Sequence, residues 1–467
     1  MPQPQPEIQV FDIDHLGIVA GIIDEIGLVE AVNELIESPA QAQVSLGHVL
    51  KAMLLNGLGF VSAPLYLFEQ FFSGKATEHL IGAGIQPSHL NDDRLGRALD
   101  KFHDYGVTKL FTTLAMKAAR QYGVAMTSVH LDSSSFHVDG QYRLFPEVTA
   151  TEGTAESENG ESTAEVEEPG VIQITHGYSR DHRPDLKQFL LDTICSADGD
   201  VPLYLRVGDG NEADKRTFPQ VIADYRKQWT FDGLYVADSA LYSAENLDLL
   251  KQVRWLSRVP LTLNEAKQVL CQVQEQEWMS SATEGYRIGE CESKYGGIEQ
   301  RWFVVESAVR RDADLKQLDK RVTQQFQQQQ AKLRALCAQE FACEPDARKA
   351  AHKFEKSLRY HRLDVLEVVA TSHHERSGRP RKAEMPSRYT YRIQITLVPN
   401  FEAIAVERTI AGRFLLATNV LDPAALSAEQ ALQEYKDQQS NERGFRFLKD
   451  PLFFTSSRRR QKSSESL

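Results

Sequence analysis

The spacing of apolar residues divides the chain into a helical part and a mixed part. From about Asp14 to Tyr122 the apolar residues recur at helical spacing, with little of the alternation that is typical of strands. Ser45 and Asn91 each precede such a run, and both residue types are favoured at a helix N-cap. We therefore predict an all-helical N-terminal domain over residues 1–123.

Runs of strand length begin after residue 124 and later alternate with helical runs. Antiparallel-type strands followed by helix, strand, helix and strand make an α/β pattern with a mixed sheet, the order expected of an RNase H-like core. We place the first part of this core at residues 124–260. The predicted strands cover residues 129–132, 171–175, 189–195, 201–207, 233–238 and 254–259, and the predicted helices cover residues 215–229 and 244–253.

The strand–helix rhythm is lost between residues 261 and 409 and then returns. We interpret this stretch as an inserted subdomain between the last core strand pair and a final helix. Residues 410–454 would complete the core, and residues 455–467 form a basic low-complexity tail. The predicted elements of the insertion are strands at 300–307 and 389–399 and a polar helix at 313–337, and those of the returning core are a strand at 412–418 and a helix at 427–448.

Composition adds little to this picture. The 467 residues are 42% hydrophobic and 25% charged, as in ordinary globular proteins. The sequence has no apolar run of membrane-spanning length and no signal peptide at its start, so we expect a cytoplasmic location. The net charge of −12 does not favour DNA binding, but residues 149–169, a predicted flexible loop, carry seven Glu and more than half of that excess. The five cysteines are irregularly spaced, which argues against disulfides or zinc.

Two aspartates stand where an α/β sheet binds ligands. Asp132 lies within the first core strand, and Asp238 ends the apolar strand Leu-Tyr-Val-Ala. Ligands and metals gather at the strand ends of open α/β sheets, and a carboxylate beside so apolar a run is costly to bury unless it is paired. Asp238 could equally cap the turn that follows, so the position alone leaves both interpretations open.

The last predicted helix carries a row of polar residues on one face. Tyr435, Gln438, Glu442 and Lys449 stand at offsets 0, 3, 7 and 14, within about 60° of one another around a helix, and Arg446 lies on the same side. Glu442 could hold a metal ion while the two cations contact phosphate. A solvent-exposed polar helix would explain the same residues without any function.

Three converging carboxylates would suit chemistry at a phosphodiester. That chemistry needs a nucleophile formed near neutral pH and compensation of charge on the leaving oxygen, and two Mg²⁺ ions about 4 Å apart supply both. Mg²⁺ prefers hard oxygen ligands such as Asp and Glu. Without metal the three acids would repel one another.

Taken together, these motifs resemble the insertion-sequence DDE transposases, in the branch whose last motif reads Tyr-x2-Arg-x3-Glu-x6-Lys. Tyr435, Glu442 and Lys449 match that spacing, while Gln438 replaces the Arg. The settings of the two aspartates, Val-His-Leu-Asp132-Ser and Tyr-Val-Ala-Asp238-Ser, also resemble this family. So do the stretch Thr-His-Gly-Tyr-Ser-Arg-Asp-His-Arg-Pro-Asp at residues 175–185, and Gly210-Asn211 with Asp214-Lys215.

The resemblance implies a role for each residue. Asp132, Asp238 and Glu442 would be catalytic and would bind two Mg²⁺ or Mn²⁺ ions, while Tyr435, Arg446 and Lys449 would hold the phosphate of the cut strand. Gln438 at the Arg position would make a weaker, uncharged contact with DNA. The N-terminal domain would recognise terminal inverted repeats, the insertion would contact element ends, and a homodimer would assemble the synaptic complex with target DNA.

The ending of the sequence opens alternatives. After Phe454 the chain reads SSRRRQKSSESL, where members of the family usually continue into further helices. We hypothesise a truncated copy, which would be a catalytically inactive DNA-binding remnant. A third hypothesis is an RNase H-like nuclease that does not transpose.

Overall fold

The computed structural model describes residues 10–38, 42–59, 62–140, 142, 172–179, 183–374, 385–438, 444–446 and 448–449. Its backbone is described at 214–216 and 365, but the side chains there are not. The acidic stretch 149–169 and the tail 455–467 therefore lie outside the described residues. No helix in the described ranges is long and apolar enough to cross a membrane.

The described part of the chain before β1 is helical, as the apolar spacing predicted. The predicted caps are present, because the Ser45 side chain accepts from the His48 amide and the Asn91 side chain accepts from the Arg94 amide. A core of Leu, Ile, Val and Phe side chains holds the helices together. They are α1 (Leu16–Ile26), α2 (Leu28–Leu35), α3 (Leu46–Gly57), η1 (Leu65–Leu67), α4 (Phe68–Phe72), α5 (Thr77–Leu80), η2 (Pro87–His89), α6 (Asp92–Tyr105) and α7 (Val107–Gln121).

Two helical glycines in this region make a matched test of the packing. A Cβ on Gly47 would lie 2.3 Å from the carbonyl oxygen of Val29, whereas a Cβ on Gly21 would meet nothing within 4 Å. We expect Gly47→Ala to lower the free energy of unfolding by about 1–3 kcal/mol through overpacking. Gly21→Ala should raise it by about 0.5–1 kcal/mol, because Ala favours the helix. Denaturant unfolding of both variants checks this, and a harmless Gly47→Ala would contradict the close contact of α2 with α3.

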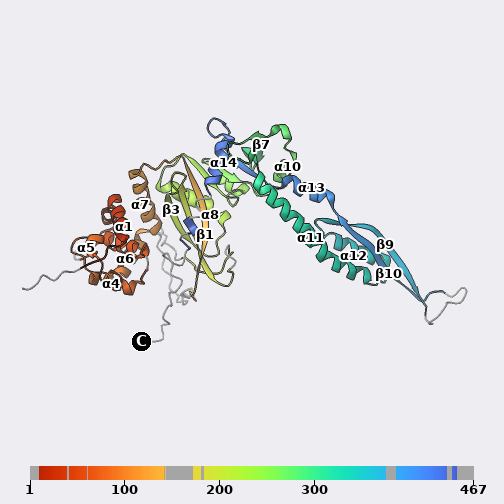
Figure 1. Cartoon of the computed structure of the whole chain (residues 1–467), viewed down its shortest axis with the longest axis horizontal. Helices are drawn as coiled ribbons and strands as arrows, with labels where there is room; N and C mark the ends of the chain where they lie inside the picture. The colour runs from red at the N-terminus through yellow and green to blue at the C-terminus, as the bar shows by residue number, and fades with distance from the viewer. Residues whose placement is uncertain are drawn as a thin grey trace, which may run out of the picture.

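A nine-stranded mixed sheet forms the centre of the molecule, in the order β3-β2-β1-β4-β5-β11-β8-β7-β6 (Figure 1). β1, β4 and β5 are parallel, whereas β2 and β3 run antiparallel to their neighbours, in agreement with the predicted RNase H-like mixed sheet. The strands are β1 (Ser128–Val138), β2 (Lys187–Ser196), β3 (Pro202–Gly208), β4 (Leu234–Ala237), β5 (Arg254–Arg258), β6 (Met279–Ser280), β7 (Tyr286–Tyr295), β8 (Ile298–Ser307) and β11 (Arg413–Thr418).

Helices cover both faces of this sheet. One face packs on α7, α8 (Asp214–Gln228), α9 (Ala244–Leu249) and α10 (Asn264–Gln272), around the fully buried Trp255, Tyr235 and Tyr225. The other face packs on α14 (Ala428–Asp437), whose Ala431 and Leu432 meet Val236 of β4. The central strands β4, β5, β8 and β11 therefore contribute alternate residues to two cores, as strands buried on both faces require.

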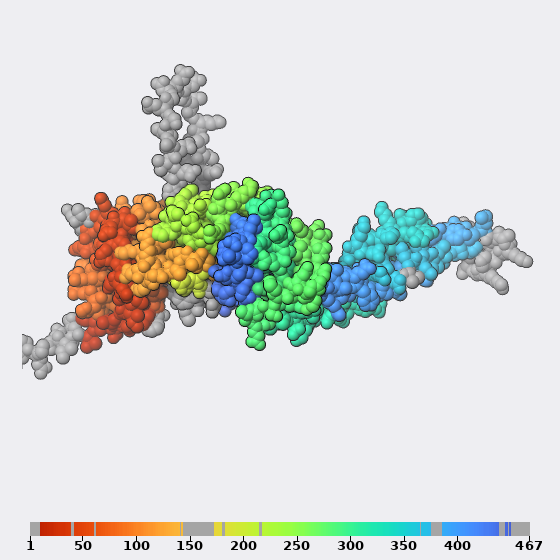
Figure 2. Space-filling view, turned by 90° about the horizontal axis from the view of Figure 1, so that it is seen from above, coloured from red at the N-terminus to blue at the C-terminus, as the bar shows by residue number. Residues whose placement is uncertain are grey.

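A long projection, here called the arm, leaves the sheet after β8 and returns at β11. It comprises residues 308–410 and is the narrow extension in Figures 1 and 2. Its one small apolar core lies between the helices and the two-stranded ribbon. The elements are α11 (Ala308–Ala338), α12 (Glu344–Glu355), β9 (His361–His373), β10 (Arg388–Pro399) and α13 (Phe401–Ile410).

Three expectations from the sequence differ from the structure. β6, β7 and β8 pair into the main sheet through β11, so the projecting part begins at residue 308 and not at 261. The strand expected at 171–175 is reduced, in its described residues, to an isolated bridge between Thr175 and Gln188, since neighbouring Gln173 bonds instead to the loop at Asp209 and Gly210. The helix expected at 244–253 ends at Leu249.

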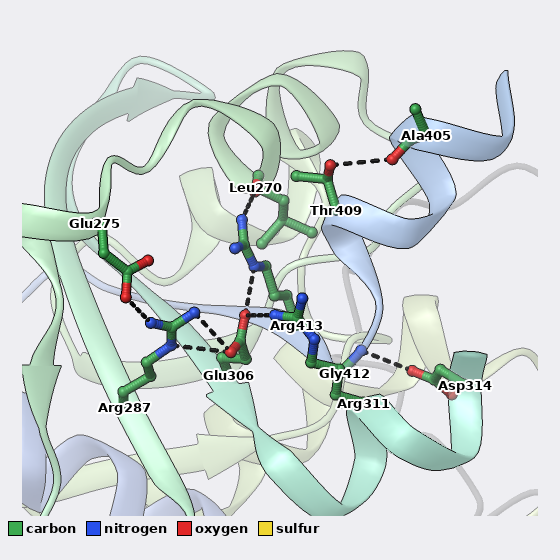
Figure 3. Close-up of polar contacts among 10 residues, drawn as sticks. All are labelled: Leu270, Glu275, Arg287, Glu306, Arg311, Asp314, Ala405, Thr409, Gly412 and Arg413. Carbon is green, nitrogen blue, oxygen red and sulfur yellow. Dashed lines mark hydrogen bonds and ion pairs between the residues drawn. The ribbon is translucent and has the colours of Figure 1, made fainter. Parts of the chain in front are cut away.

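One carboxylate ties together both ends of the arm. Glu306, at the end of β8, accepts hydrogen bonds from Arg287 of β7 (2.9 Å), Arg311 of α11 (3.1 Å) and Arg413 of β11 (2.8 Å) (Figure 3). The amide of Gly412 donates to Asp314, also in α11 (3.0 Å). The outgoing helix and the returning strand are thus fixed to each other and to the sheet.

Candidate active site

The two predicted aspartates lie on adjacent parallel strands. The β1–β4 ladder pairs residues 106 apart in the sequence, and the β4–β5 ladder pairs residues 20 apart. Continuing these registers past the end of β4 places Asp132, Asp238 and Arg258 in one row across three strands, which are spaced about 4.8 Å apart. The row carries two carboxylates and one guanidinium.

All three side chains of this row belong to the face that α14 covers. Leu234 and Val236 of β4 and Leu256 of β5 contribute to the core beneath α14. Because alternate residues of a strand share a face, Asp238 and Arg258 project on that side as well. The site therefore lies between the sheet and α14 and its continuation.

Backbone amides hold each carboxylate. One oxygen of Asp132 accepts from its neighbour Ser133 (2.8 Å), and one oxygen of Asp238 accepts from Ala240 (2.9 Å). The carbonyl of Asp238 accepts from the Ser257 hydroxyl (2.7 Å), which fixes the end of β4 against β5. Asp238 does cap its turn, as the simpler interpretation proposed, and the same contacts fix its place in the row.

α14 crosses β1 next to Asp132. Nε2 of His130 lies 3.5 Å from a carboxylate oxygen of Glu434, and the Gln438 side chain donates to the carbonyl of Leu131 (3.1 Å). Burial acts to raise the pKa of Glu434, but the polar groups of His130 and Ser128 beside it outweigh burial and hold that pKa below its ordinary value. A charged Glu434 thus anchors the helix one turn before Gln438.

The predicted third carboxylate, Glu442, lies outside the described residues. The described residues before and after it both contact β1: Gln438 does so at Leu131, and the ring centroid of Phe445 lies 6.4 Å from that of Phe136. These two contacts flank Asp132 along its strand.

The other predicted side chains of this segment divide into three cases. Gln438 is 8% exposed and its side-chain amide donates to the backbone carbonyl of Leu131, so its contact with DNA stays a prediction. Lys449 lies over the ring of Phe136, 5.6 Å from its centroid. Arg446 is exposed to solvent.

Tyr435 lies beside a residue that the sequence interpretation missed. Its ring centroid lies 5.8 Å from that of Phe414, and the Arg258 guanidinium carbon lies 5.7 Å from the same Phe414 centroid. Burial raises the pKa of the Tyr435 phenol, and Arg258 opposes this shift. The available signal for Arg258 was a charged residue ending an apolar strand, the same signal that marked Asp238.

The donor set of this site is suited to a hard cation. Within the described ranges, no group of three or more His, Cys, Asp or Glu side chains is arranged to hold a metal ion. Asp132 and Asp238 supply two neighbouring carboxylates, the ligand type that Mg²⁺ prefers. Glu442, the predicted third carboxylate, lies outside those ranges, and its part in the site stays a prediction.

Comparison with known families decides the class of protein. A family model described as a transposase DDE domain matches residues 131–466, well over half of the chain. The chain belongs to the DDE transposase domain family. A second model, a domain of unknown function (DUF4277), matches residues 8–116 of this transposase. A search of curated proteins finds no significant match.

Membership accounts for the position of the site. The DDE domain begins at Leu131, next to the first carboxylate, and spans the sheet, the arm and α14. The DUF4277 match covers nearly all of the helices before the sheet. DDE transposase domains use divalent metal ions, generally Mg²⁺, which agrees with the oxygen ligands in the row.

Proposed function

We propose that this transposase cleaves DNA at the ends of an insertion element and joins the freed 3′-OH to target DNA. Asp132, Asp238 and Glu442 would hold two Mg²⁺ or Mn²⁺ ions. The observation that carries the proposal is the row of two carboxylates on adjacent parallel strands of a DDE domain. When bound, the ions supply a nucleophile near neutral pH and charge compensation at the phosphate.

The protein's own groups would position the DNA strand. Arg258 and Tyr435 would bind a phosphate next to the carboxylates, since a guanidinium and a phenol can both donate to phosphate oxygens. Arg446 and Lys449 would contact the strand further along β1. Gln438 would hold the helix to β1 instead of touching DNA, because its amide already donates to Leu131.

Two other regions would bind DNA outside this site. The arm carries 20 Lys and Arg against 13 Asp and Glu, a net charge of +7 in a chain whose total is −12. This segregated positive charge suits contact with duplex phosphates. The N-terminal domain, residues 1–123, would recognise the terminal inverted repeats. Residues 124–260 and 410–454, with the strands of 279–307, would form the catalytic core, and two copies would pair the ends.

Metal removal tests the proposal. The substrate is duplex DNA that carries the terminal repeats flanking the coding gene. We expect strand cleavage at the element ends with Mg²⁺ or Mn²⁺, followed by joined products, and complete loss of both with EDTA. A gel shift without any product would support an inactive DNA-binding remnant. Hydrolysis without joining would support a nuclease.

A further inference from the structure

The one cation of α14, Lys436, lies over the ring of Tyr286, 4.6 Å from its centroid, and α14 carries no arginine. The family pattern has an arginine three residues after the tyrosine, but here Gln438 stands there and its side chain bonds to Leu131. Arg258 supplies one positive charge from β5. A second one comes from an element distant in the sequence.

Phe414 is the meeting point of these groups. Its ring centroid lies 5.7 Å from the Arg258 guanidinium carbon, 5.9 Å from that of Arg310, and 5.8 Å from the ring centroid of Tyr435. Arg310, in the first turn of α11, belongs to the arm. The charged groups acting on the Tyr435 hydroxyl are Arg258, Asp238 and Arg310. The root of the arm therefore reaches the proposed active site.

Arg310 differs from its neighbour in how it is bound. Arg311 donates to the buried Glu306, within the network of Figure 3. Arg310 has a carboxylate of Asp314 at 3.7 Å, and both side chains of that pair are more than a third exposed. Exposed pairs of this kind contribute little, so the Arg310 guanidinium can exchange Asp314 for a stronger anion at small cost.

The backbone that carries Arg310 is held firmly. The Ser307 hydroxyl caps α11 by accepting from the Arg310 amide (3.5 Å), and Glu306 fixes the next residue, Arg311. Gly412, with φ +74°, packs so closely that a Cβ there would lie 2.5 Å from the Cβ of Arg311. An exposed, weakly paired side chain on a well-anchored backbone suits the binding of a phosphate at a defined place.

We propose that Arg310 binds a DNA phosphate beside Tyr435, so that the arm supplies a cation where Gln438 replaces the arginine of the family pattern. The inference rests on the proposed function and adds a residue to it. A phosphate between Arg258 and Arg310 would relieve the repulsion of two guanidinium groups gathered at one aromatic ring, and charge-assisted hydrogen bonds to both would fix its orientation.

Neutral phosphate analogues test this contact. Duplexes of the element end, each with one methylphosphonate near the cleavage site, are titrated without divalent metal so that binding is read apart from chemistry. For wild-type protein, one position should weaken binding about tenfold or more, the size of a charged hydrogen bond. Arg310→Ala should bind unmodified DNA more weakly than the wild type by the same factor. A methylphosphonate at that position should not weaken the binding of Arg310→Ala any further.

Arg321→Ala is the matched control, because it removes an exposed arginine from the same helix about 16 Å further along. It should respond to the methylphosphonate as the wild type does. If every methylphosphonate lowers the DNA affinity of Arg310→Ala by the same factor as that of the wild type, Arg310 does not contact any of these phosphates. Wild-type cleavage is assayed in parallel. If the protein cleaves but the effects of Arg310→Ala and the methylphosphonate on binding are independent, only the role of Arg310 is overturned. If the two effects on binding overlap but no cleavage occurs, only the proposed reaction is overturned.

A rescue variant gives a second measurement. Gln438→Arg returns a cation to α14, and in the Arg310→Ala background it should recover most of the lost affinity and cleavage. Thermal unfolding of both variants checks that they are folded. Absence of rescue in a folded double variant, together with wild-type sensitivity to the methylphosphonate, would place the phosphate contact elsewhere.

Discussion

Asp132→Asn is expected to reduce metal-dependent cleavage by about a thousandfold or more, because a bound metal contributes several kcal/mol to transition-state stabilisation. Asn keeps the size of the side chain and can still accept from the Ser133 amide, so the strand should be undisturbed. Binding to the element end should remain close to that of the wild type. The measurements are cleavage rates and gel shifts at fixed salt concentration.

Asp139→Asn is the control for this change. Asp139 follows β1 and is exposed, so its substitution removes the same charge at the far end of the same strand. It should cleave normally. If Asp132→Asn cleaved DNA at the wild-type rate, Asp132 would not be a metal ligand.

Glu306→Ala should lower the free energy of unfolding by about 3–5 kcal/mol, the cost of leaving buried charges without their partner. Burial acts to raise the pKa of Glu306, but its bonds and ion pairs with Arg413, Arg287 and Arg311 outweigh this and lower the pKa. Denaturant unfolding of the variant gives the measurement. The exposed pair Arg348–Glu344 is the control, and Glu344→Ala should cost about 1 kcal/mol or less.

The contribution of Glu306 should depend on pH with a definite sign. Because its pKa in the folded protein is below the ordinary value near 4.3, the stabilisation is fully present above that value. It is lost as pH falls through the lower pKa of the folded state. The difference between wild type and Glu306→Ala should therefore shrink in acid. An equal or growing difference in acid would contradict an ionised Glu306 in the network.

Local features of the fold could be predicted because neighbouring residues determine them. Ser45 and Asn91 each cap a helix with the side chain that the sequence suggested. Asp132 and Asp238 were placed on strands for the same reason, since the apolar residues beside them define each strand.

Long-range pairing could not be predicted in this way. β8 joins the sheet through β11, more than a hundred residues later, and no local pattern specifies that register. Arg258 was not predicted as a site residue, because only the pairing of β5 with β4 brings it next to Asp238. Helical spacing placed Gln438 on the same face as Tyr435. It could not predict that the Gln438 side chain is buried, because that burial depends on the contact with β1.

The most direct test of the account is the position of Mn²⁺ in crystals of the protein with DNA from the element end. An anomalous difference map should show manganese between the carboxylates of Asp132 and Asp238, with Arg258 and Tyr435 on a neighbouring phosphate. Manganese bound elsewhere, with these two aspartates facing only protein groups, would contradict the proposed site.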